Sequence, residues 1–66
     1  MPPTSGLTKE DIKQGWKREA DKIYKEPNKY GADEVWIYRY PNWDEDRFYF
    51  KEGILIKEEE VLHGSF

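Results

Sequence analysis

Hydrophobic residues recur at helical spacing near the start of the chain. Ile12 and Trp16 lie four residues apart, so they would share one face of a helix. Thr8 is a favourable N-cap residue, and Asp11 stands three residues later, where a capping box places its acidic partner. The pattern therefore predicts a helix over residues 8–19.

The hydrophobic stripe does not stop at the end of that segment. Ala20 and Ile23 continue it, and no Gly or Pro interrupts the chain between Trp16 and Pro27. Residues 21–26 therefore fit two alternatives, which are the last turns of a longer helix and a short first strand.

Strand-forming residues dominate the rest of the chain. Val, Trp, Ile and Tyr fill one segment, and aromatic residues stand at alternate positions in the next. The pair Glu52-Gly53 is the signal of a two-residue hairpin turn. The sequence predicts strands at 34–40, 47–51 and 54–61, joined by loops or turns rich in Pro, Asn, Gly and Asp at 27–33 and 41–46.

A chain of 66 residues is long enough for one domain. We expect an α+β fold in which one N-terminal helix packs on a three- to four-stranded antiparallel sheet. The domain is predicted to span residues 7–62, with a disordered lead-in at 1–6 and a tail at 63–66.

The functional prediction depends on which face of the sheet the helix covers. In one facing, the helix covers the side of Val35 and Ile37, together with Phe48, Phe50, Ile54 and Ile56 of the hairpin. The opposite face then forms an exposed aromatic patch of the kind that marks interaction sites. The candidate partner-binding residues in this facing are Trp36, Tyr38, Tyr40, Trp43, Tyr49 and Leu55.

The second facing stays open. In it, Trp36 and Tyr38 face the helix, and the smaller Val35 and Ile37 lie outside. Small domains often use their large aromatic residues in the core, and aromatic residues make up 17% of this chain. In this facing the aromatic patch would not exist.

The composition narrows the chemistry. The chain has no Cys and one His, so no metal site and no cofactor is expected, and the acidic run at 44–46 lacks the spacing of a calcium loop. No nucleophile elbow or phosphate-binding loop is present, so we expect no enzyme. A net charge of −3 argues against nucleic acid as a partner. No apolar run reaches the roughly 20 residues of a transmembrane segment.

Three segments together resemble the SmpA/OmlA family of small bacterial outer-membrane lipoproteins, which includes the small lipoprotein of the β-barrel assembly machinery. The segments are Leu7-Thr8-Lys9-Glu10-Asp11-Ile12, Glu34-Val35-Trp36-Ile37-Tyr38, and Arg47-Phe48-Tyr49-Phe50-Lys51-Glu52-Gly53-Ile54-Leu55. The likeness covers most of residues 7–60 and implies a fold shared with β-lactamase-inhibitor-like domains. Because that fold has a strand after the helix, the resemblance favours a strand at 21–26.

The chain departs from the family pattern in two places. The family commonly has a Gly-x-Pro break after the first helix, whereas this chain reads Arg18-Glu19-Ala20. The lipid-bearing Cys is also missing, so the resemblance implies membrane anchoring only through an N-terminal lipid anchor outside this sequence. The implied location is the cell envelope, on the periplasmic side of a membrane.

The expected function is non-catalytic protein binding through the aromatic sheet face. Two alternatives stay open beside it. One is a self-associating structural domain, which would form a homodimer either through the same face or through an edge strand. The other is a carbohydrate binder that uses Trp36, Tyr40 and Trp43 as stacking platforms.

Overall fold

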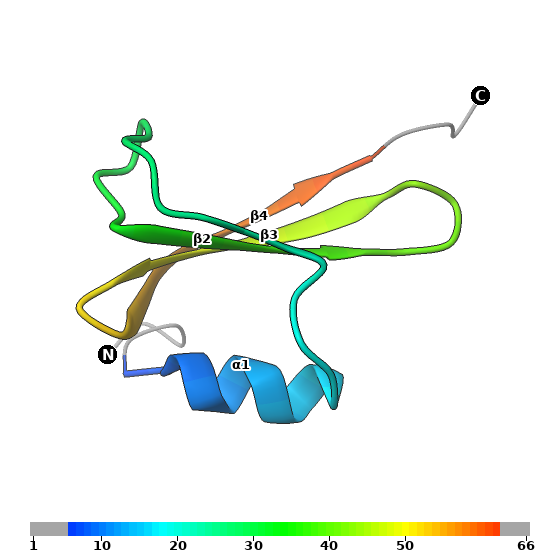
Figure 1. Ribbon diagram of the computed structural model, residues 1–66, viewed down its shortest axis with the longest axis horizontal. Helices are drawn as coiled ribbons and strands as arrows, with labels where there is room; N and C mark the ends of the chain where they lie inside the picture. The colour runs from blue at the N-terminus through cyan, green and yellow to red at the C-terminus, as the bar shows by residue number, and fades with distance from the viewer. Residues whose placement is uncertain (1–5, 63–66) are drawn as a thin grey trace.

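The computed structural model describes residues 6–62, which form a four-stranded antiparallel sheet with one helix lying across one face (Figure 1). The strands follow one another in chain order across the sheet, each paired with the next. The elements are α1 (Lys9–Trp16), β1 (Lys22–Tyr24), β2 (Glu34–Arg39), β3 (Glu45–Lys51) and β4 (Ile54–Val61). Most of the predicted lead-in, 1–5, and the predicted tail, 63–66, lie outside the described residues.

The expected fold class needs a correction, because the helix is a smaller part of the molecule than an α+β domain implies. Helix accounts for 14% and strand for 44% of the described residues. α1 has eight residues, and none of them is fully buried. The domain is therefore mainly a β-sheet that bears one short helix, and α+β describes it only loosely.

The start of α1 agrees with the prediction. The Thr8 side chain accepts a hydrogen bond from the Asp11 backbone N–H at 3.2 Å, and the Asp11 carboxylate accepts one from the Thr8 backbone N–H at 2.9 Å. This reciprocal pair is a capping box, and it satisfies N–H groups that the first turn leaves without helical partners.

The predicted helix end at residue 19 is wrong, because α1 ends at Trp16. Lys17 adopts the left-handed conformation with φ of 58°, and its N–H bonds to the Lys13 carbonyl. The Tyr38 hydroxyl, which comes from the sheet, donates to the Arg18 carbonyl at 3.1 Å. Contacts with the sheet thus engage the residues that would have continued the helix.

The strands largely follow the sequence. β1 confirms the short strand expected within 21–26, and β4 has the predicted bounds. β3 begins at Glu45, two residues earlier than expected, because the turn is tighter than predicted. The Tyr40 N–H bonds to the Asp44 carbonyl at 2.8 Å, so pairing resumes at the next residue.

The large aromatic residues form a core between the sheet and the helix. Five buried residues contact one another there, and partly buried residues at 7–20 pack against them. The second facing considered above is therefore the observed one, and the prediction of an exposed Trp36 and Tyr38 is wrong. The buried residues are Trp36, Tyr38, Phe48, Phe50 and Leu55.

The β3–β4 hairpin explains why Leu55 belongs to this core. Glu52 and Gly53 form its two-residue turn, both with positive φ, so Phe50 pairs with Leu55. Paired residues share a face of the sheet. The expectation that Ile54 shares a face with Phe50 is wrong, because Ile54 pairs with Lys51 on the other side and is exposed.

A register irregularity follows at Tyr49 and Phe50, and it shifts the pairing so that Tyr49 lies opposite Lys57. Ile56 is left out of the pairing and is exposed, so its predicted place in the core is also wrong. The outer edge of β4 is partly occupied by the chain itself, because the Leu55 N–H bonds to the Leu7 carbonyl at 2.8 Å.

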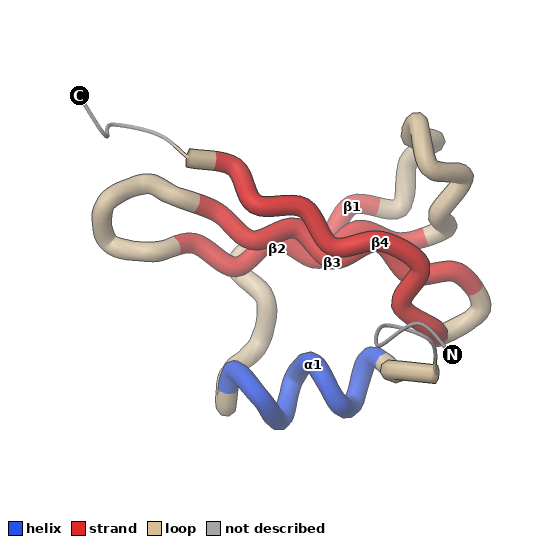
Figure 2. The backbone as a smooth tube through the Cα atoms, turned by 180° about the vertical axis from the view of Figure 1, so that it is seen from behind, coloured by secondary structure: helices blue, strands red, loops and turns tan. Residues whose placement is uncertain are grey.

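A second, smaller cluster lies on the face of the sheet that the helix leaves open. Ala32, Val35, Ile37 and Tyr49 are buried there, and Tyr30 packs against them. The loop between β1 and β2 lies on the opposite side of the sheet from α1 (Figures 1 and 2). This loop covers one part of the open face and leaves the rest accessible.

Candidate functional site

Four of the six predicted partner-binding residues are buried. Trp36, Tyr38 and Leu55 lie beneath the helix, and the Tyr38 side chain has no exposed surface. Tyr49 is buried on the opposite face. Because the four belong to two separate clusters, the structure does not bring the predicted residues together into one patch.

The other two predicted residues, Tyr40 and Trp43, are exposed at the β2–β3 turn, with 38% and 71% of their surface accessible. Tyr40 also lies beside Trp16, with ring centroids 5.4 Å apart. A flat stacking platform would have needed Trp36 beside them, and Trp36 is buried. The predicted carbohydrate site is therefore incomplete.

The open face of the sheet contains a groove with a volume of about 360 Å³. Its floor is formed by Val35, Ile37 and Tyr49 of β2 and β3. One end is bounded by Tyr24 and the first residues of the β1–β2 loop, and the other end is bounded by charged residues where β2 ends and β3 begins. The lining residues are Tyr24, Glu26, Pro27, Asn28, Val35, Ile37, Arg39, Glu45, Arg47 and Tyr49.

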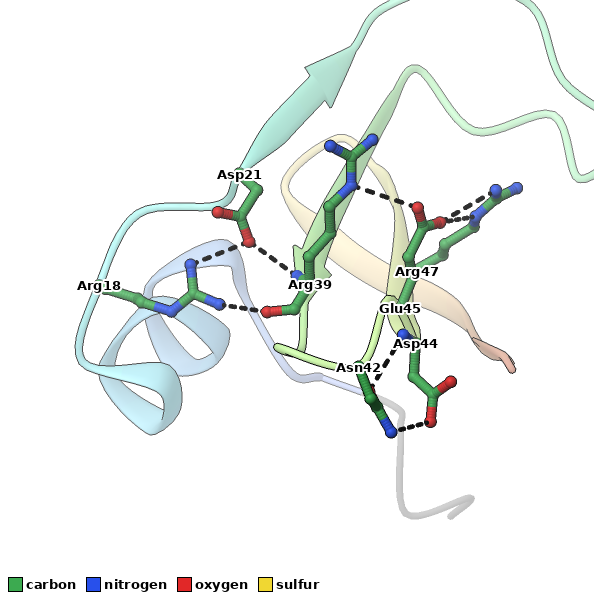
Figure 3. Close-up of polar contacts among 7 residues, drawn as sticks. All are labelled: Arg18, Asp21, Arg39, Asn42, Asp44, Glu45 and Arg47. Atoms are coloured by element: carbon green, nitrogen blue, oxygen red, sulfur yellow. Dashed lines mark hydrogen bonds and ion pairs between the residues drawn. The ribbon is translucent and has the colours of Figure 1, made fainter. Parts of the chain in front are cut away.

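Two arginines and one glutamate form a charged cluster at that second end (Figure 3). Arg39 donates from Nε to one oxygen of Glu45 at 3.2 Å. Arg47 donates from Nε and Nη2 to the other oxygen at 3.2 and 3.1 Å. The Glu45 side chain is only 12% exposed, whereas Arg39 and Arg47 are 38% and 36% exposed. One mostly buried carboxylate therefore holds two accessible guanidinium groups.

Strand pairing explains how the three side chains meet. Arg39 lies opposite Glu45 across β2 and β3, so the two share a face. Arg47 follows Glu45 by two positions along β3 and points to the same face. Burial alone would lower the pKa of Arg47, but hydrogen bonds to Glu45 and Tyr49 raise it above its usual value. Two guanidinium groups and one carboxylate leave this three-residue cluster with one positive charge in excess.

The backbone of Arg39 is held by hydrogen bonds of its own, apart from those of its side chain. Its N–H donates to the Asp21 carboxylate at 2.7 Å, and its carbonyl accepts from the Arg18 guanidinium at 3.1 Å. Arg18 also donates to Asp21 at 2.9 Å. The Arg39 N–H, together with Arg18, lowers the pKa of Asp21. These bonds hold the end of β2 in place, as Figure 3 shows.

The loop at the other end of the groove is also ordered by side-chain hydrogen bonds. The Asn28 amide oxygen accepts from the backbone N–H groups of Tyr30 and Ala32, and its NH₂ group donates to the Ala32 carbonyl at 2.8 Å. The Tyr30 ring meets Tyr49 edge-on at 4.5 Å, and both hydroxyls donate to Glu59. The groove therefore has a fixed wall at each end.

The Nη groups of Arg39 are hydrogen-bond donors that the described residues do not use. Among residues 6–62, no side chain or carbonyl pairs with its two Nη nitrogens, which point away from Glu45 in Figure 3. Two Nη groups in one plane match the two oxygens of a carboxylate. This free fork at the edge of an apolar floor is the most distinctive chemical feature of the groove.

The sequence prediction missed all three residues of this cluster. The predicted third strand began at residue 47, so Glu45 was assigned to a turn and had no expected face. A strand starting at residue 45 would have placed Glu45 and Arg47 two positions apart on one side. Residues 44–47 are all charged and show no alternation of polar and apolar positions, so the sequence contains no clear signal for this cluster.

Other kinds of site lack support in the described part of the chain. Within residues 6–62, no group of three or more acidic or His side chains is placed to hold a metal ion. The one helix there lacks the length and apolar character that crossing a membrane would take.

Comparison of the chain with family models, curated proteins and solved structures finds no match.

Proposed function

We propose that this chain is a non-catalytic protein-binding module, and that it binds its partner in the groove on the open face of the sheet. The observation that supports this most directly is the groove itself. It combines an apolar floor with accessible polar groups held in fixed positions, as ligand sites commonly do. This surface replaces the aromatic patch expected from the sequence.

The groove has the dimensions of a short extended peptide. Val35, Ile37 and Arg39 line it at alternate positions along β2. The four residue-to-residue steps from Val35 to Arg39 correspond to about 13 Å. Tyr24 stands at the rim with 39% of its surface exposed. Tyr is among the residue types most enriched at protein-binding hot spots.

Self-association has weaker support. The face expected to join two copies is covered by α1. The outer edge of β4 contains Glu58, Glu59 and Glu60, and pairing this edge with a second copy around that run would bring like charges together. β1 offers only three residues at the other edge of the sheet.

The proposed setting is the cell envelope, on the periplasmic side of a membrane, with a lipid anchor preceding the chain. The resemblance to SmpA/OmlA lipoproteins is its only support. The genomic sequence upstream of Met1 tests it directly. An export signal ending in a lipid-acceptor Cys would support the setting, and a native start at Met1 would contradict it.

A photo-crosslinking experiment tests the binding surface. A crosslinking residue would replace Tyr24 at the groove rim and, as a control, Gln14 on the helix, in cells that express the protein. We expect one partner to be captured at position 24 and not at position 14. The purified partner should then bind the Tyr24→Ala variant about tenfold more weakly than the parent chain. Gln14→Ala should leave that affinity unchanged.

Equal capture at both positions would contradict the groove as the binding surface. So would a purified partner whose affinity is the same for Tyr24→Ala and for the parent chain.

A further inference from the structure

The chemistry of the groove indicates what kind of peptide it would take, provided that the groove binds a protein as proposed above. The described chain offers a donor fork at one end and an apolar floor in the middle. Arg39 and Ile37 both line the groove, two positions apart on the same face of β2, and Ile37 is buried in the floor. We propose that the groove receives an extended segment of a partner protein, with an acidic side chain on the Arg39 fork and an apolar side chain over Ile37.

Charge complementarity supports an acidic occupant at this end. Glu45 is shared by Arg39 and Arg47, so a single buried carboxylate faces two guanidinium groups. A second carboxylate at the Arg39 fork would neutralise the remaining positive charge and form paired hydrogen bonds. The ion pair with Glu45 also holds the Arg39 side chain in advance, so binding loses less side-chain freedom.

The far end of the groove makes the occupant directional. Glu26 lies there, beside Pro27 and Asn28. An acidic side chain placed at that end would meet a like charge, whereas the Arg39 end attracts it. We therefore expect the segment to bind with its acidic side chain at the Arg39 end of the groove and not at the Glu26 end.

Two matched peptides test this inference on the full chain. The probes are acetyl-Leu-Ala-Glu-amide and acetyl-Leu-Ala-Gln-amide, which place the apolar and the polar side chain two positions apart on one face and differ only in the charge of the last residue. Binding is followed by NMR titration of the isotope-labelled protein. We expect the Glu peptide to bind about tenfold more tightly and to shift the signals of Ile37, Arg39 and Tyr49.

Variants assign the difference to the fork. Arg39→Gln should abolish the preference for the Glu peptide, and Arg39→Lys, which keeps the charge but not the fork, should remove most of it. Lys13→Gln is the matched control, because it removes one positive charge from the helix on the opposite side of the sheet. It should preserve the tenfold preference.

Several results would overturn the inference. Equal affinity of the two peptides would do so even if Arg39→Gln fails to fold, since that comparison uses the parent chain. A loss of preference in Lys13→Gln would point to overall charge instead of the fork. Displacement of the Glu peptide by an equal concentration of inorganic phosphate would indicate a general anion site. If partner capture at Tyr24 succeeds while these tests fail, protein binding in the groove stands and only the acidic recognition is wrong.

Discussion

The indole ring of Trp16 stacks on the phenol ring of Tyr38, with centroids 4.6 Å apart and planes inclined by 15°. This contact joins the last residue of α1 to the second-last residue of β2. Trp16 also meets Phe48 edge-on at 6.5 Å, so one helical side chain bridges two strands. The helix is too short to be stable alone, and such contacts hold it on the sheet.

Replacing Trp16 should therefore be costly. Trp16→Ala is expected to lower the free energy of unfolding by roughly 3 kcal/mol, near the lower end for a large aromatic residue because Trp16 is only partly buried. Trp43→Ala is the control, since Trp43 is 71% exposed, and it should change stability by less than about 0.5 kcal/mol. Urea unfolding measures both. Equal losses would show that Trp16 does not anchor the helix.

The capping box at the start of α1 gives a second prediction. Thr8→Ala removes the side chain that accepts from the Asp11 N–H, and it should cost about 1 kcal/mol. Thr8→Ser keeps a hydroxyl in the same place and should retain most of that stability. Thermal unfolding of the three proteins tests the cap. An alanine variant as stable as the serine variant would contradict it.

The hairpin turn is a site for stabilisation. Glu52 adopts a φ of 52°, which is strained for a residue of its type, and Gly53 follows with a φ of 83°. Glu52→Asn should raise the free energy of unfolding by roughly 0.5 kcal/mol, because Asn-Gly suits this turn. Gly53→Ala should instead cost about 1 kcal/mol, because a Cβ disfavours positive φ. A neutral Gly53→Ala variant would argue against the turn geometry.

Tyrosine ionisation should limit stability in alkali. The Tyr40 hydroxyl donates to Asp46 at 2.7 Å, and this bond, with partial burial, raises the pKa of Tyr40 from 10.0 to about 12. A folded pKa above the unfolded one means that the contribution is complete below about pH 10 and is lost as the pH rises toward 12. The pKa values of Tyr30, Tyr38 and Tyr49 are shifted in the same direction.

Ultraviolet titration of tyrosinate measures this effect. Asp46→Asn should bring the pKa of Tyr40 back toward its ordinary value, because the neutral amide lacks the negative charge of the carboxylate. Tyr40→Phe should remove the corresponding step from the titration. An unchanged titration in Asp46→Asn would show that Asp46 does not control this group.

Local signals in the sequence predicted much of the backbone. Thr8 and Asp11 predict the start of the helix, because a capping box forms between residues within one helical turn. Glu52 and Gly53 predict the hairpin, because its turn also forms between residues close in sequence. The two-residue turn already implies that Leu55 lies opposite Phe50. The error in the predicted facing of Leu55 came from assigning strand faces separately, without applying the pairing that the turn requires.

The facing of β2 could not be read in this way. Val35 and Ile37 on one side, and Trp36 and Tyr38 on the other, are all suited to burial, so alternation favours neither face. Pairing decides it, because Trp36 lies opposite Phe48 and Phe50 opposite Leu55. These pairs join the large aromatic side chains of neighbouring strands into one continuous apolar surface, and the helix packs on that surface.

The sequence by itself determined where the helix begins, where the hairpin turns and that the segments of β2, β3 and β4 are strands, because these depend on residues within a few positions of one another. It left residues 21–26 open between helix and strand. Only the tertiary structure decided that the helix stops at Trp16, that Tyr38 is core, and that Arg39 and Arg47 share Glu45. Each of those outcomes depends on groups brought together by pairing between strands. The groove is one of them, since its floor and both of its ends come from separate segments of the chain.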